Sequence, residues 1–168
     1  MRDPQSTARV GSASMARKDI SLSDVERAEV LGAARNLQVA TNGREGFPHL
    51  TTLWFYVDDG VVTFRSFTKS QRIVNLRRDD RITVLAELGD DYEELRGVMI
   101  QGHARLSTDP GDVMRAYAEV TKKMEGLDEI ADEAVEGLFG RFATKNTVVR
   151  VDPVKIISWD HRKLAGSY

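Results

Sequence analysis

The stretch HLTTLWFYVDDGVVTFRSF, residues 49–67, decides the fold class of this chain. Its two runs, 49–57 and 61–67, are rich in Thr, Val and aromatic residues, which is typical of strands. Between them Asp58, Asp59 and Gly60 supply a tight turn. We therefore predict a β-hairpin here, and this is the clearest local signal in the sequence.

Further strands are predicted on both sides of the hairpin, because alternating or β-branched runs recur along the chain. They cover residues 37–41, 82–87, 98–106, 147–151 and 155–159. Helices are predicted from a capping box at Ser23 and Glu26, from residues 70–78, and from Asp109 followed by Pro110. Strands do not alternate with helices, which disfavours a doubly wound parallel sheet. We expect a mainly β fold, an antiparallel barrel with flanking helices.

The chain of 168 residues suits one domain. Residues 1–18 mix Ser, Ala, Gly and Arg without periodicity, so we predict a disordered tail there and a single domain over residues 19–168.

Composition excludes several classes of function. There is no cysteine, and His49, His103 and His161 are too far apart for a helical metal-binding pair, so we expect no metal site. A net charge of -2 argues against nucleic-acid binding. No apolar run reaches the roughly 20 residues of a membrane span, and no secretory signal is visible. We expect a cytoplasmic protein.

The densest polar cluster, RSFTKSQR at residues 65–72, lies where a strand ends and a helix begins. Free amides at a helix start attract anions, and nearby cations and hydroxyl groups add to this attraction. The cluster offers such groups on Lys69, Arg72, Ser66, Thr68 and Ser70. No glycine-rich nucleotide loop is present, so we predict a phosphate that belongs to another kind of ligand. The alternative is a helix cap with solvated cations.

Two aromatic positions are candidates for the wall of a ring pocket. On the strand before the turn, Thr52 and Trp54 share one face while Thr51 lies on the other. Near the end of the chain, Trp159 precedes a basic group that includes Arg162. Both tryptophans are equally compatible with packing in the core.

The run KSQRIVNLRRD, residues 69–79, with the strand that follows it, resembles a signature stretch of the pyridoxamine 5'-phosphate oxidase-like split β-barrel family. The ending at residues 158–164 is similar to that of its flavin/deazaflavin oxidoreductase group, in the branch that binds coenzyme F420. The similarity runs in order over residues 22–164. Asp80 replaces a proline found in many members, and Gln71 replaces a cation of many FMN-binding members, which favours F420.

The resemblance implies a six-stranded split barrel that forms a homodimer with two cofactor sites at the subunit interface. It assigns the cofactor phosphate to Lys69, Ser70, Gln71 and Arg72, flanked by Ser66 and Phe67. It also assigns the ring pocket to Thr51, Thr52 and Trp54, with Trp159 and Arg162 reaching the cofactor from the second subunit.

The function implied is that of an F420-dependent oxidoreductase, an enzyme that transfers a hydride between the deazaflavin and an apolar, conjugated small molecule. No catalytic side chain is assigned, and solvent, Tyr56 and His161 remain candidate proton donors. Three alternatives stay open: an FMN-dependent enzyme, a carrier of F420 or haem without turnover, and an interaction module that binds an acidic protein tail.

Overall fold

The computed structural model describes residues 19–164, so the predicted tail, residues 1–18, lies outside the described residues. The helices are α1 (Asp24–Ala33), α2 (Gln71–Arg78), α3 (Pro110–Glu125) and α4 (Asp132–Phe139). The strands are β1 (Asn36–Asn42), β2 (Pro48–Trp54), β3 (Tyr56–Asp58), β4 (Val61–Phe67), β5 (Arg81–Leu88), β6 (Arg96–Ser107) and β7 (Asn146–Asp160). Among the described residues, no helix combines the length and apolar character needed to cross a membrane.

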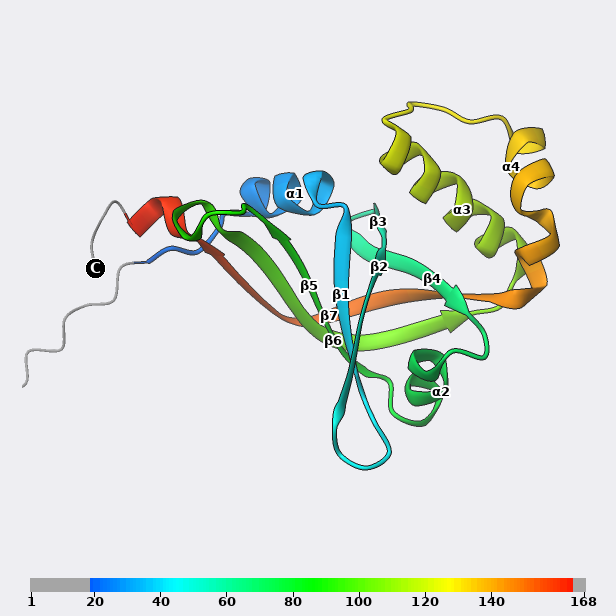
Figure 1. Ribbon diagram of the computed structural model, residues 1–168, viewed down its shortest axis with the longest axis horizontal. Coiled ribbons are helices and arrows are strands. Elements are labelled where there is room, and N and C mark those ends of the chain that lie inside the picture. The colour runs from blue at the N-terminus through cyan, green and yellow to red at the C-terminus, as the bar shows by residue number, and fades with distance from the viewer. Residues whose placement is uncertain (1–18, 165–168) are drawn as a thin grey trace, which may run out of the picture.

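The strands form one antiparallel sheet in the order β2-β1-β5-β6-β7-β4-β3, curled into a half-barrel with helices around it (Figure 1). The predicted barrel class is confirmed, with seven strands where six were expected. Six strands were implied by the family resemblance; compared with the individual runs predicted, the last two runs join into β7, and the run at 49–57 divides at Phe55 into β2 and β3. These two strands lie at opposite edges of the sheet, so the buried Phe55 is the corner that joins one edge to the other.

The predicted turn between β3 and β4 is confirmed. Asp59 and Gly60 both have positive φ angles, 48° and 77°, as in the two-residue turns whose twist suits a hairpin. Only the three residues of β3 pair with β4, however, because the chain before Phe55 pairs with β1. The hairpin is therefore shorter than predicted.

The two short strands predicted near the end of the chain are one strand, β7. The break expected at Asp152 and Pro153 is a β-bulge, since Gly102 on β6 faces Pro153 while Gln101 faces Lys155. A side chain on Gly102 would overlap the carbonyl group of Asp152. Gly102 is thus needed for the close approach of the two strands at the bulge.

Side chains alternate along the strands and divide the packing into two clusters. Inward residues such as Leu37, Val84 and Val149 form the main core, which α1 and α2 complete. On the outer side, α3 covers β3, β4 and the first half of β7, with Tyr117 and Val148 in the contact, and α4 packs against α3 (Figure 1). Within residues 19–164, no helix covers the outer face of β2, β1, β5 and β6.

We predict that Gly102→Ala lowers the free energy of unfolding by about 1–3 kcal/mol, because the added methyl group forces the bulge apart. Gly32→Ala is the matched control. Gly32 lies in α1 with open space around its Cα, so alanine should raise stability by up to about 1 kcal/mol. Urea unfolding of both variants measures the difference, and equal effects would contradict the role given to Gly102.

Candidate functional site

The guanidinium group of Arg72, in the first turn of α2, connects two strands that are far apart in the sheet. Its Nε donates to Thr51 Oγ1 on β2 at 3.0 Å, and its Nη1 donates to Ser66 Oγ on β4 at 2.8 Å. Since β2 is one edge strand and β4 lies beside the other edge, Arg72 bridges the opening of the half-barrel. The sequence-predicted residues Thr51, Ser66 and Arg72 therefore meet at one point.

Ser70 adds a second hydroxyl group to this point, because its Oγ lies 2.9 Å from Ser66 Oγ. Ser70 occupies the N-cap position of α2, but its side chain accepts no hydrogen bond from the helix. The first amides of α2 are therefore left without the usual side-chain acceptor. We name the group of Thr51, Ser66, Ser70 and Arg72 the phosphate corner.

The charge of Arg72 is not neutralised by any carboxylate in the described part of the chain. Burial lowers the pKa of its guanidinium group from the usual value, because a desolvated cation is less stable. Lys69 lies exposed beside it and likewise forms no ion pair with a described residue. An unpaired, half-buried cation with a second cation at the rim favours an anionic ligand.

The side-chain amide of Gln71 is engaged within α2. Its Nε2 donates to Asn75 Oδ1 at 2.8 Å, and Asn75 Nδ2 donates to Thr41 Oγ1 on β1 at 3.0 Å. Asn75 is fully buried, so this chain of hydrogen bonds fixes the first two turns of α2 against the barrel. The phosphate contact predicted for Gln71 stays a prediction.

The residues predicted to line the ring pocket divide between two faces. Thr51 is half-buried on the inner side of β2, whereas Thr52 and Trp54 lie on the outer side, with Trp54 52% exposed. Phe67, at the end of β4, is also exposed. Thr51 thus contributes to the phosphate corner, and Thr52 and Trp54 belong to the outer face.

Trp159 and Arg162 lie far from the phosphate corner in the same chain. Ser66 pairs with Thr147 at the start of β7, and Trp159 pairs with Gly97 at its end, roughly 40 Å along the strand. Arg162 is held by Asp160, with Nε to Oδ1 at 2.9 Å and Nη2 to Oδ2 at 2.7 Å. These two predicted residues do not meet the others within one chain.

Trp159 does share the uncovered outer face with Thr52 and Trp54. The strand register aligns five outward side chains in one row, from β2 to β7: Thr52, Gln38, Leu85, Met99 and Ile157. Trp54 and Trp159 are next to the two ends of this row, about 19 Å apart across the sheet. The Oε1 atom of Gln38 is buried and has no hydrogen-bond partner.

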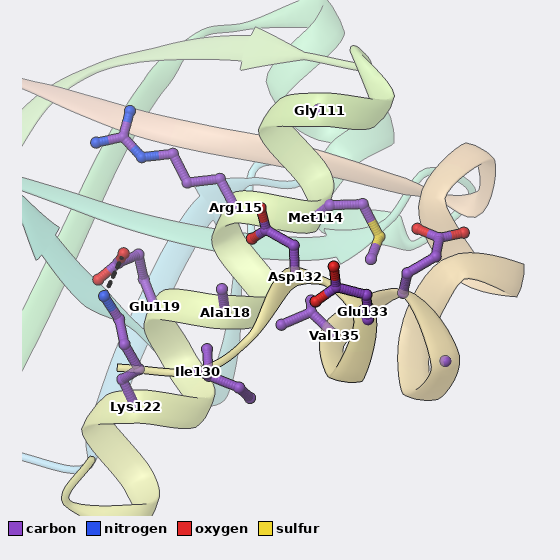
Figure 2. Close-up of a pocket in the computed structure, with 12 residues that line it drawn as sticks. Gly111, Met114, Arg115, Ala118, Glu119, Lys122, Ile130, Asp132, Glu133 and Val135 are labelled. Carbon is purple, nitrogen blue, oxygen red and sulfur yellow. Dashed lines mark ion pairs between the residues drawn. The ribbon is translucent and has the colours of Figure 1, made fainter. Parts of the chain in front are cut away.

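A hollow of about 850 Å³ lies elsewhere, between α3 and α4 (Figure 2). Met114 and Val135 form part of its apolar lining, and Asp132 and Glu133 add negative charge. None of the predicted cofactor residues lines it. Its lining carries four carboxylates against two basic side chains, which disfavours an anionic ligand there. Residues 19–164 contain no group of acidic or histidine side chains arranged to hold a metal ion.

The sequence matches the family described as pyridoxamine 5'-phosphate oxidase over residues 24–160. The chain belongs to this family. A search of curated proteins found no significant match. Among the solved structures that are similar, the conserved hypothetical protein Rv2991 from Mycobacterium tuberculosis shares 37% identity with this pyridoxamine 5'-phosphate oxidase family member. The alignment covers 90% of this chain and 93% of that chain, with a TM-score of 0.81.

Two more distant structures share the fold of the family. An F420 reductase is 18% identical, over 77% of this chain and 94% of its own, with a TM-score of 0.58. An FAD-binding protein from Mesorhizobium loti is 19% identical, over 82% of this chain and 94% of its own, also with a TM-score of 0.58.

Sequence reasoning missed two positioning residues. Asn75 follows Gln71 by four residues, which is the spacing of neighbours on a helix face, so that contact was predictable. The ion pair of Asp160 with Arg162 has no comparable sequence pattern. Asp160 ends β7, and the conformation of the turn that follows brings Arg162 back to its carboxylate.

We predict that Asp160→Asn costs about 1–3 kcal/mol at pH 7, since the buried carboxylate accepts charged hydrogen bonds from Arg162. These bonds lower the pKa of Asp160, so the native state is favoured above the usual carboxyl pKa of 3.8 and loses this advantage as the pH falls. The difference between the variant and the unsubstituted protein in urea unfolding should therefore shrink below about pH 4.

The control is Asp152→Asn, whose carboxylate pairs with the exposed Arg105 and should contribute under about 1 kcal/mol. A difference for Asp160→Asn that is constant from pH 7 to pH 3 would exclude the proposed contribution of its charge.

Proposed function

We propose that this protein is an F420-dependent oxidoreductase that transfers a hydride between the deazaflavin and an apolar, conjugated small molecule. The observation that carries the proposal is the unneutralised guanidinium group of Arg72, held between Thr51 and Ser66 at the opening of the barrel. A cofactor phosphate supplies the missing negative charge. The family and the F420 reductase among the structures with this fold support the assignment.

The residues of the phosphate corner fit the phosphate group. Arg72 has three further N–H groups beyond its two hydrogen bonds, and Ser66 and Ser70 offer hydroxyl groups beside it. Lys69 adds a cation from the rim. These groups hold the phosphate from several directions, and α2 presents its N-terminal amides to the same place.

When bound, the deazaflavin supplies the hydride chemistry, and the protein orients it and excludes water. In this proposal Thr52 and Trp54 form one wall of the ring pocket on the outer face. Gln71 is neutral and its amide is engaged by Asn75, so the corner supplies two cations, Lys69 and Arg72. By the family resemblance, Gln71 stands where many FMN-binding members have a cation, and this favours F420.

The proposed active form is a homodimer. In the same chain Trp159 lies four strands from Trp54, about 19 Å across the sheet. Within residues 19–164 no helix covers the outer face of β2, β1, β5 and β6, and this face carries the half-buried Leu85 and Met99 and the Gln38 Oε1 atom, which has no hydrogen-bond partner among these residues. A second copy on this face would cover these groups and bring the partner subunit's Trp159 to the ring pocket.

We predict that Lys69→Ala combined with Arg72→Ala raises the Kd for F420 at least 100-fold, because each charged hydrogen bond is worth about 1.5–3 kcal/mol. Fluorescence titration with F420 and with FMN measures binding. Arg77→Ala is the matched control: Arg77 is an exposed cation of the same helix with no ion pair to a described residue, and its removal should leave the Kd unchanged.

The outcomes separate the candidate functions. Unchanged F420 binding in the double variant would exclude the phosphate role. Tighter binding of FMN than of F420 would identify the FMN-dependent alternative. Tight F420 binding without hydride transfer to any of a panel of quinones, enones and tetrapyrroles would identify a carrier.

We predict a solution mass of about 38 kDa, twice the 18.8 kDa of one chain. Met99→Glu places a charge in the middle of the uncovered face and should give monomers, whereas Leu138→Glu changes an exposed residue of α4 and should not. Light scattering coupled to size-exclusion chromatography measures the mass, and circular dichroism confirms the fold of both variants. A monomeric unsubstituted protein would contradict the homodimer.

A further inference from the structure

Lys123, near the end of α3, places its amine in apolar surroundings. The Nζ atom lies 3.5 Å from the centre of the Phe55 ring, which is completely buried at the corner between β2 and β3. It also donates to the carbonyl oxygen of Leu31 at 2.9 Å, in the last turn of α1. This amine therefore joins three separate elements of the fold.

No carboxylate within residues 19–164 pairs with Lys123, in contrast to its neighbour in sequence. Lys122 forms an ion pair with Glu119 at 2.7 Å. Burial without a countercharge lowers the pKa of the Lys123 amine from the usual 10.5 to about 8. At pH 7 such an amine is neutral about 300 times more often than an ordinary lysine.

The amine opens onto a hollow of about 360 Å³ between α1, α3 and β3. The hollow is separate from the phosphate corner, and its lining comprises Leu31, Gly32, Tyr56, Val57, Glu119, Lys122, Lys123, Leu127 and Asp128. Burial raises the pKa of Tyr56 to about 12, so the Tyr56 hydroxyl is neutral. Glu119 forms an ion pair with Lys122. Asp128 is then the remaining carboxylate in the lining, and its negative charge disfavours anionic reagents.

We propose that Lys123 is a site of reversible covalent attachment for small, neutral aldehydes. One N–H of the neutral amine donates to Leu31 while the nitrogen lone pair adds to the carbonyl carbon. The carbonyl oxygen takes up one proton from the attacking nitrogen and one from solvent and leaves as water, which gives the protonated imine, so no oxidant or reductant is consumed. The protonated imine retains one N–H, which can donate to the Leu31 carbonyl.

The test uses propionaldehyde with cyanoborohydride at pH 7, which reduces each imine to a stable secondary amine. Peptide mass spectrometry then compares Lys123 with Lys122 in the same chain. We expect Lys123 to be labelled at least 10 times faster than Lys122, and the rate at Lys123 to rise with pH through a midpoint near 8. Equal rates at the two lysines would overturn the proposal.

Three controls distinguish the site from general lysine reactivity. In 8 M urea the preference should vanish, because it depends on burial. Lys123→Arg should keep the contact with Leu31, retain the fold and lose the fast-labelled site. Glyoxylate, an anionic aldehyde, should label Lys123 more slowly than propionaldehyde does, and a preference for glyoxylate would overturn the assignment to neutral aldehydes.

Discussion

The proposed function depends on the double hydrogen bond of Arg72 to Thr51 and Ser66. These two hydroxyl groups belong to strands near opposite ends of the sheet order, and the partly desolvated guanidinium group between them has no countercharge within residues 19–164. Placing a cation there costs stability unless an anion binds. Asn75 donates a hydrogen bond to Thr41, which anchors α2 against β1 and so helps to position Arg72.

The path of the chain through the half-barrel also explains where the phosphate corner lies. Phe55 carries the chain from one edge of the sheet to the other, and the two halves of the predicted strand therefore serve different neighbours. One result is the phosphate corner at the opening. The other is an outer face that the helices of the described chain leave uncovered over β2, β1, β5 and β6, with Trp54 and Trp159 near its two ends. In the proposed homodimer, this face lies against the second copy of the chain.

Local signals predicted much of this architecture. The capping box at Ser23 and Glu26, and the turn at Asp59 and Gly60, involve residues close in sequence, and the structure contains both. The division at Phe55 and the bulge at Pro153 were not predictable, because each depends on which strand lies alongside. A run of apolar and Thr residues has the pattern of one strand even when its two halves pair with different strands.

By itself the sequence determined the fold class and the cluster of cations and hydroxyl groups at residues 65–72, since strand composition and a strand-to-helix junction are encoded by neighbouring residues. Only the tertiary structure decided which of these groups meet. Thr51 contacts Arg72 across 21 positions of the chain, and Lys123 contacts Leu31 across 92. Such contacts follow from the curl and register of the sheet, which many distant residues set together and no short motif records.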